Sequence, residues 1–142
     1  MWKYEGKEFT SDMIGDAVGF VYTIYDNVTK KKYIGKKKFY SKVTKPPLKG
    51  KTRKRRELKE SDWQSYHGSN EELKSLVESN EDPKRFYRCI LRLCYSLGEM
   101  TYYEMREQMM NDVLLKPDEY YNSFVGGKIH RNHLRKLIEK TS

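Results

Sequence analysis

The sequence predicts an α+β domain in which a small antiparallel sheet of about three strands is flanked by helices. Three observations indicate this fold. Residues 19–41 hold two β-prone segments joined by a polar turn, and residues 84–96 form a third, more apolar segment. Residues 96–115 carry the clearest helical pattern of the chain. A length of 142 residues is typical of one domain, so we expect a single unit over residues 1–142.

The first predicted element is a β-hairpin. The stretch "GFVYTIY" (19–25) alternates β-branched and aromatic residues, which is typical of a strand. It is followed by turn chemistry in "DNVTKK" (26–31) and by renewed strand character in "KYIGKKKFY" (32–40). Gly35 lies inside the second strand, where a glycine indicates a bulge or a close backbone approach. We expect Gly35 to have a structural role.

The hairpin leads into a strongly basic segment. Two prolines, a glycine and dense charge predict an extended loop over residues 39–60. From Lys30 to Arg56 there are 14 basic residues and no acidic one, and this stretch carries all of the net charge of +9. Basic side chains interleaved with aromatic ones suit a phosphate backbone and its bases. We therefore expect nucleic acid to bind here. The candidate residues are Lys51, Arg53, Lys54, Arg55 and Arg56.

Helical patterns surround the third strand. Residues 61–80 contain two short helical pieces, and Ser69 or Asn70 can cap the second one. The long helix expected in residues 96–115 has an apolar stripe. Its members are Met100, Tyr103, Met110 and Leu114. Residues 128–140 predict a short, basic, amphipathic helix at the C-terminus.

Composition also bears on location. The longest apolar stretches are far shorter than the roughly 20 residues needed to cross a bilayer. The first residues, "MWKYEGKEFTSDM", carry charges and do not have the pattern of a secretory leader. We expect a cytoplasmic protein that does not enter the membrane.

Five short segments, taken in order, resemble the GIY-YIG nuclease family. "FVY" (20–22) and "YIG" (33–35) resemble the paired motif that gives the family its name. Three further matches follow along the chain. They are "DWQSYHGSNEELKSL" (62–76), "TYYEMREQ" (101–108) and "YYN" (120–122). The resemblance covers residues 18–123 and is greatest to the free-standing, phage-borne enzymes related to homing endonucleases, which places the protein in a bacterial or phage-infected cell.

The resemblance implies a metal-dependent DNA endonuclease that hydrolyses phosphodiester bonds. It assigns Tyr22 as the general base and Tyr33 as the residue that orients the water or the phosphate. Lys36 or Lys37 would supply positive charge. Glu104 would hold one Mg²⁺ or Mn²⁺ ion, with phosphate oxygens and waters completing the coordination.

Several site assignments remain open at this stage. Glu107, one turn after Glu104, is an alternative metal ligand. His67 would either hydrogen-bond the phosphate and shuttle a proton or be a surface histidine. Asn122 is expected to be a structural hydrogen-bonding residue near the site. Tyrosine is a poor base at its ordinary pKa of about 10, and we expect the neighbouring lysines, Lys32, Lys36 and Lys37, to favour the phenolate form of Tyr33.

The sequence departs from the family pattern at two positions. Phe20 stands where the family usually has glycine. Val43 stands where the family has an arginine on the helix after the second motif, so Arg55, with Arg53 and Arg56, is the candidate replacement. These departures give weight to a second hypothesis, a nucleic-acid-binding module of the same fold with weak or no cleavage. A basic protein bound to RNA or ribosomes is a third.

The nuclease hypothesis makes a spatial prediction. The Glu104 side chain must approach the hydroxyls of Tyr22 and Tyr33, and a position across the sheet, facing away from them, would contradict it. DNA is the expected partner, and cleavage of both strands would call for a homodimer.

Overall fold

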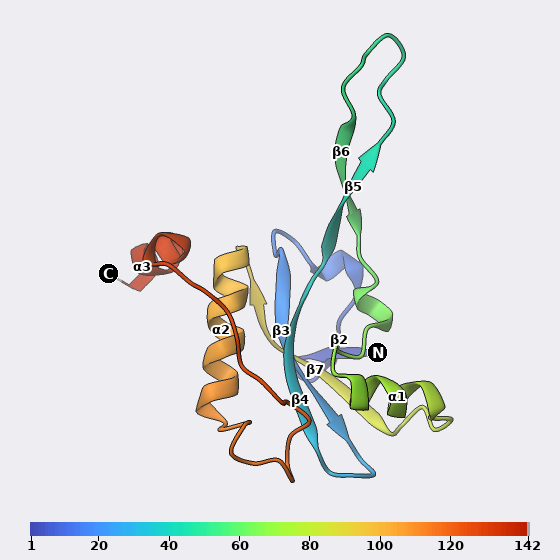
Figure 1. The fold of residues 1–142 in the computed structure, drawn as a ribbon, viewed down its shortest axis with the longest axis vertical. Coiled ribbons are helices and arrows are strands. Elements are labelled where there is room, and N and C mark those ends of the chain that lie inside the picture. The colour runs from blue at the N-terminus through green and yellow to red at the C-terminus, as the bar shows by residue number, and fades with distance from the viewer. Residues whose placement is uncertain (142) are drawn as a thin grey trace.

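The computed structural model describes residues 1–141, except for the side chains of Arg56 and Thr141. Its strands form a five-stranded sheet in the order β2-β1-β7-β3-β4 and a separate two-stranded ribbon, β5-β6 (Figure 1). The strands are β1 (Trp2–Tyr4), β2 (Lys7–Glu8), β3 (Gly19–Asp26), β4 (Lys32–Lys38), β5 (Tyr40–Lys45), β6 (Arg55–Glu60) and β7 (Phe86–Cys94). The helices are η1 (Ser11–Met13), η2 (Trp63–Ser65), α1 (Glu71–Ser79), α2 (Leu97–Met110), η3 (Arg131–Leu134) and α3 (Arg135–Thr141).

The sheet confirms the α+β class but is larger than the three antiparallel strands predicted. The predicted hairpin is β3 paired with β4, and the predicted third strand is β7, which pairs antiparallel with β3. The prediction missed β1 and β2, which are only three and two residues long. Because β1 pairs with β7 in parallel, the sheet is mixed.

The segment predicted as an extended loop is a β-ribbon, so this part of the prediction was wrong. β5 and β6 pair antiparallel from Tyr40↔Glu60 to Lys45↔Arg55, and only residues 46–54 lie outside the strands. Their turn is closed by a hydrogen bond from the Lys51 N–H to the Leu48 carbonyl (2.8 Å). Gly50 has φ +82° there, a conformation that favours glycine.

Caps set the helix boundaries. The Asn70 side chain accepts a hydrogen bond from the Leu73 N–H and starts α1, while Ser96 does the same for Glu99 and starts α2. The predicted helical stripe was too long, because α2 ends at Met110 and Leu114 lies beyond it. The C-terminal segment predicted over residues 128–140 becomes helical from Arg131 onwards.

The sheet separates two clusters of buried side chains. Phe20 and Tyr22 point to the face on which α1 and η2 pack, together with Trp63. Val21 and Ile34 point to the other face, against Met100 of α2. This alternation is that of a strand buried on both faces. Among the helices of residues 1–141, none combines the length and the apolar composition that crossing a membrane requires.

Candidate active site at the edge of strand β4

The two motif tyrosines meet over Gly35. Tyr22 on β3 is the register partner of Gly35 on β4, and Tyr33 lies two residues before Gly35, so both side chains point to the same face. The two ring centroids are 6.3 Å apart. A Cβ atom on Gly35 would lie 2.5 Å from the Tyr22 hydroxyl oxygen and 3.0 Å from the Tyr33 ring. Only glycine leaves room for the Tyr22 ring to extend over β4 toward its outer edge.

The Tyr22 hydroxyl is buried without a partner. Its ring is fully buried, and among the described residues its oxygen has no hydrogen-bond partner. Burial raises the pKa of Tyr22 well above its ordinary value, and the nearby Tyr66, Tyr33 and Glu104 act in the same direction. The phenol is therefore neutral in this state of the protein.

Tyr33 is the phenol that reaches the candidate pocket. Its hydroxyl shares a hydrogen bond with the Ser69 hydroxyl (3.1 Å). Burial raises the pKa of Tyr33, and the hydrogen bond to Ser69 offsets part of this rise. The expectation that lysines favour the Tyr33 phenolate was wrong, because the balance of effects raises this pKa and does not lower it.

The lysines of β4 have other partners. The Lys36 ammonium donates to Thr101 Oγ1 (3.0 Å) and lies 3.9 Å from Glu104 Oε1. The Lys37 side chain points to the opposite face from Lys36, where its ammonium pairs with Asp62 (2.7 Å) and lies over the Tyr66 ring. Lys36 is thus the cation placed beside the predicted metal ligand.

Glu104 comes from α2, the helix that covers the face opposite the tyrosines, yet its carboxylate reaches the shared edge. Its side chain lines the same pocket as Tyr33, and its negative charge contributes to raising the pKa of both Tyr22 and Tyr33. Burial raises the pKa of the Glu104 carboxyl, while the Lys36 ammonium and the Lys36 backbone amide oppose this effect. The Glu104 carboxylate and the Tyr33 phenol thus line one pocket at the outer edge of β4, while Tyr22 is not among the residues that line it.

The pocket between these groups has a volume of about 290 Å³ and polar walls. Its lining residues are Tyr33, Ser69, Asn70, Glu104, Gln108, Asn122, Ser123, Phe124 and Gly126. They come from β4, from the start of α1, from α2 and from the segment after residue 120, which the chain brings back along β4.

Two amide side chains fix the edge of β4. Asn122 Oδ1 accepts from the Ile34 N–H (3.0 Å), and Asn122 Nδ2 donates to the Ile34 carbonyl (2.8 Å). Gln108 Nε2 donates to the same carbonyl (2.9 Å). Gln108 Oε1 is buried in the pocket wall with no partner among the described residues. Asn122 was predicted from its motif, whereas Gln108 was not, although it is the last residue of the motif segment 101–108 and lies one turn after Glu104.

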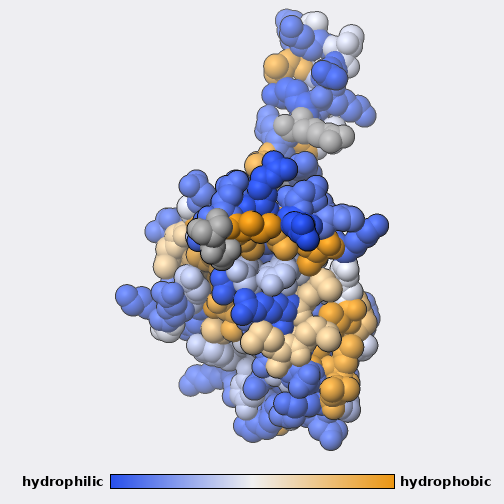
Figure 2. Space-filling view, turned by 90° about the vertical axis from the view of Figure 1, so that its left-hand side faces the viewer, coloured by the Kyte–Doolittle hydropathy of each residue, from blue (hydrophilic) through white to orange (hydrophobic). Residues whose placement is uncertain are grey.

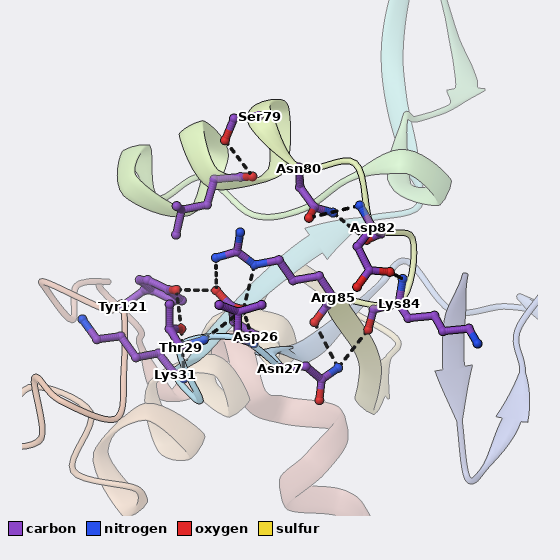
Figure 3. A network of polar contacts seen from close by, with 12 residues as sticks. Asp26, Asn27, Thr29, Lys31, Ser79, Asn80, Asp82, Lys84, Arg85 and Tyr121 are labelled. Carbon is purple, nitrogen blue, oxygen red and sulfur yellow. Dashed lines mark hydrogen bonds and ion pairs between the residues drawn. The ribbon is translucent and has the colours of Figure 1, made fainter.

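A buried charge network holds the Asn122 segment in place (Figure 3). Asp26 is fully buried and accepts two hydrogen bonds from Arg85 (2.9 and 3.0 Å) and one from the Tyr121 hydroxyl (2.7 Å). Burial alone would raise the pKa of Asp26, but the hydrogen bonds from Arg85, Tyr121 and the Val28 N–H outweigh it and lower this pKa. Because Tyr121 adjoins Asn122, the network positions the amide that binds β4.

Two predicted site residues lie elsewhere. Arg55 is on the ribbon, where it donates to the Pro46 carbonyl (3.3 Å) and pairs with Glu57 (3.4 Å). His67 Nδ1 contacts the Ser65 carbonyl (2.8 Å), and its ring packs near Phe86. Burial and the charge of Arg88 lower the pKa of His67. Neither side chain lines the pocket.

The predicted nucleic-acid-binding residues cluster at the far end of the ribbon. Lys51, Arg53 and Lys54 are exposed in its terminal loop. Arg55 follows them at the start of β6, while the side chain of Arg56 lies outside the described part of the structure.

The pocket suits a hard cation bound through few protein ligands. Within residues 1–141 no group of three or more His, Cys, Asp or Glu side chains is gathered for a metal. Glu104 offers one carboxylate, and the unpartnered Gln108 Oε1 offers a second oxygen nearby. Mg²⁺ is commonly held by one or two carboxylates, with waters and substrate phosphates supplying the remaining oxygens. The donor set therefore fits Mg²⁺ or Mn²⁺.

The mixed sheet, with Tyr33 and Glu104 from two of the motif segments lining one pocket at its edge, is consistent with a GIY-YIG domain. A comparison with protein families places the chain more narrowly. Residues 2–125 match the family described as "Putative endonuclease segE, GIY-YIG domain", and the chain belongs to this family. The match extends beyond the expected core of 18–123 and includes β1 and β2. Comparisons with curated proteins and with solved structures gave no match.

Proposed function

We propose that this chain is a metal-dependent DNA endonuclease whose site is the pocket at the outer edge of β4. The observation that supports it most directly is that Glu104 and Tyr33 line one polar pocket. Tyr33 points to one face of the sheet, whereas Glu104 comes from α2, which packs on the opposite face. Membership of an endonuclease family supports the same reaction class. The substrate in this proposal is the phosphodiester backbone of DNA.

Each residue has a chemical task in this proposal. Glu104 would hold the divalent ion, and the unpartnered Gln108 Oε1 would be a second oxygen available to it. A bound Mg²⁺ or Mn²⁺ would polarise the scissile phosphate and favour ionisation of the neighbouring phenols. Tyr33 orients the phosphate or the water through its hydroxyl. Lys36, beside Glu104, stabilises the negative charge that develops on phosphate oxygens.

Tyr22 remains the proposed general base. A buried hydroxyl without a hydrogen-bond partner costs about 1–3 kcal/mol, and an unsatisfied group of this kind calls for an explanation. To act as base, Tyr22 would first lose its phenolic proton to solvent, which a bound cation would favour, and the phenolate oxygen would then accept a proton from the attacking water. Because the Tyr22 hydroxyl is buried, water would reach it only after a movement of the residues around it, among which are Tyr33 and Gly68.

A second candidate function is a DNA-binding module that does not cleave. It is favoured by one observation, since Arg55, proposed as the catalytic arginine, lies on the ribbon and pairs with Glu57 there. If the chain does cleave DNA, the cation on which cleavage would depend is Lys36 and not Arg55.

Plasmid nicking distinguishes the two candidates. We expect the protein to nick supercoiled DNA with Mg²⁺ or Mn²⁺ and not with EDTA. Glu104→Gln should lower the rate at least about 100-fold because the ion loses its carboxylate. Glu107→Gln is the matched control, since it makes the same change one turn along α2, and it should retain activity.

The outcomes lead to different conclusions. Loss of nicking only in Glu104→Gln supports the endonuclease and assigns the metal ligand. Unchanged nicking by Glu104→Gln, or nicking in EDTA, would overturn the proposed mechanism. DNA binding by the wild type and by both variants, without cleavage, would favour the non-cleaving module.

A further inference from the structure

The β5-β6 ribbon, defined as residues 40–60, holds most of the net charge of the protein. It contains nine basic and two acidic residues, a net +7, whereas the whole chain has +9. The other 121 residues therefore carry only +2. Figure 1 shows the ribbon projecting from the body of the domain, and Figure 2 shows that its surface is mainly hydrophilic. Charge of one sign is concentrated on one projecting element.

The base of the ribbon is firmly attached to the core. Phe39 is fully buried, its N–H donates to the Val18 carbonyl (3.0 Å), and its carbonyl accepts from the Ser61 N–H (2.8 Å). The Glu60 carboxylate accepts from Trp63 Nε1 (2.7 Å) and from the Ser11 hydroxyl. A ribbon anchored in this way has a defined direction relative to the pocket.

The two faces of the ribbon differ. Residues directly opposite one another share a face, so Lys42, Thr44 and Leu58 lie on one face, which we call the Leu58 face. Lys45, Arg55, Glu57 and Lys59 lie on the other, where Glu57 pairs with Lys45 (2.9 Å) and with Arg55 (3.4 Å). On the Leu58 face the carboxylate is that of Glu60, which is engaged at the base. Leu58 is 69% exposed on this face, beside the exposed Lys42 that is its register partner.

The dimensions of the ribbon match one groove of duplex DNA. Two strands lie about 4.8 Å apart, and six residues on each side extend for about 17 Å. The major groove, about 12 Å wide, admits a two-stranded β-ribbon with its side chains, whereas the minor groove is only about 6 Å wide. Apolar side chains such as Leu58 can contact thymine methyl groups, which are presented in the major groove.

We propose that the β5-β6 ribbon enters the major groove of duplex DNA with the Leu58 face toward the base edges. The terminal loop, with Lys49, Lys51, Arg53 and Lys54, contacts phosphates on either side of the groove. The inference rests on the proposed function only in naming DNA as the ligand. Binding is separate from the chemistry at Glu104, so it is measured in EDTA, where no cleavage takes place.

The first test measures which groove is used. Affinity of the wild type is compared for a 30-base-pair duplex and for the same duplex with a bulky C5 substituent on every cytosine, which fills the major groove. We expect at least a tenfold loss of affinity with the filled groove, and no displacement from an unmodified duplex by the minor-groove ligand netropsin. Displacement by netropsin together with unchanged binding to the filled duplex would overturn the proposal.

The second test assigns the binding to the ribbon. The triple variant Lys49→Gln, Lys51→Gln, Lys54→Gln should reduce the slope of log K against log salt by about 2–3, because each phosphate contact contributes about 0.9. The control is Lys7→Gln, Lys74→Gln, Lys84→Gln, which removes three exposed charges outside the ribbon. Equal slopes for the two variants would exclude the ribbon as the binding element.

The third test distinguishes the two faces of the ribbon. Lys42→Glu and Lys59→Glu reverse one exposed charge each at nearly the same height on opposite faces. We expect Lys42→Glu to weaken binding at least tenfold and Lys59→Glu to weaken it less than threefold. Equal losses would contradict the assigned orientation. Nicking by these variants is a separate measurement, so a protein that binds in this way but does not cleave would refute the endonuclease and leave the groove assignment standing.

Discussion

The hydroxyl of Tyr22 combines a structural cost with a proposed chemical role. It is fully buried, lacks a partner among the described residues and lies against Gly35 and Gly68, two positions without side chains. A residue selected for packing alone would not need this oxygen. The two glycines leave space for the ring and for its hydroxyl, which is the atom that the proposed reaction would use.

Replacing Tyr22 separates stability from activity. Tyr22→Phe removes an unpartnered buried hydroxyl, so we expect the free energy of unfolding to stay the same or to rise by about 1 kcal/mol. If Tyr22 is the general base, nicking should fall about 100-fold or more. Urea denaturation and plasmid nicking on the same preparation check the two outcomes.

Tyr121→Phe is the matched control for this substitution. It removes a buried hydroxyl that donates to Asp26 (2.7 Å), so it should lower the free energy of unfolding by about 1.5–3 kcal/mol. A stability loss in Tyr22→Phe comparable to that in Tyr121→Phe would show that the Tyr22 hydroxyl has a partner in solution. Full activity of Tyr22→Phe would transfer the role of base to another group, with Tyr33 the next candidate.

At the scale of the elements, the Asp26 network connects the β3-β4 turn to the segment that ends in Asn122. Arg85 precedes β7 and Tyr121 follows the α2 region, so three distant parts of the chain meet at one carboxylate. Asn122 then pairs with both backbone groups of Ile34 on β4. The hydrogen bonds at Asp26 thus hold the segment that carries Asn122 against the edge of the sheet where the pocket lies.

The network makes stability depend on pH in the acid range. The pKa of Asp26 is lower in the folded state than its ordinary value of 3.8, so the unfolded chain takes up this proton first as the pH falls. The contribution is fully present above about pH 5 and is lost as the pH drops toward the folded-state pKa. Asp26→Asn should lower the free energy of unfolding at pH 7 by about 3 kcal/mol, because Arg85 loses its buried partner.

Urea denaturation at pH 7, 4 and 2.5 tests this prediction. Wild type should lose more stability between pH 7 and 2.5 than Asp26→Asn does, so the two curves should converge. Glu57→Gln, which removes a carboxylate from an exposed pair on the ribbon, should follow the wild type. Parallel curves for wild type and Asp26→Asn would show that Asp26 is not the group responsible.

The elements found from the sequence are those with a clear hydrophobic period. β3, β4 and β7 alternate or run apolar over seven to nine residues, and α2 carries a helical stripe. β1 and β2 are too short to show a period, and they are held by pairing with β7 and with one another. In sequence the ribbon resembles a loop because it contains two prolines and dense charge, while Val43 and Leu58 give only a weak alternation.

The site was predicted where a motif marks it. Tyr33, Glu104 and Asn122 were found through the family motifs and line one pocket. Gln108 and the Asp26 network were missed, because their partners lie more than 50 residues away in the sequence and only folding brings them together. Arg55 was predicted at the site because the sequence does not reveal the ribbon, which carries this side chain away from the pocket.

At the scale of the whole molecule, the chain divides into a nearly neutral body that holds the pocket and a basic ribbon that projects from it (Figure 1). The ribbon joins the core through its flanking residues Phe39 and Ser61, and through Tyr40 and Glu60 at its base. We therefore expect that substitutions can separate cleavage at the β4 pocket from DNA binding by the ribbon.

Shortening the ribbon tests this separation. Thr44 and Arg56 are register partners, so residues 45–55 can be replaced by Asn-Gly, the pair favoured in a two-residue hairpin turn. The variant loses Lys45, Lys49, Lys51, Arg53, Lys54 and Arg55, a charge of +6, and keeps the base of the ribbon. We expect its free energy of unfolding to stay within about 0.5 kcal/mol of wild type, because residues 45–54 are exposed and Arg55 is only partly buried. Nicking should persist at about 20 mM salt and fall at least tenfold more than wild type at 150 mM, where weakened phosphate contacts limit binding. Equal salt dependence of nicking would place the DNA grip on the body of the domain, and loss of nicking at low salt by a folded variant would place part of the active site on the ribbon.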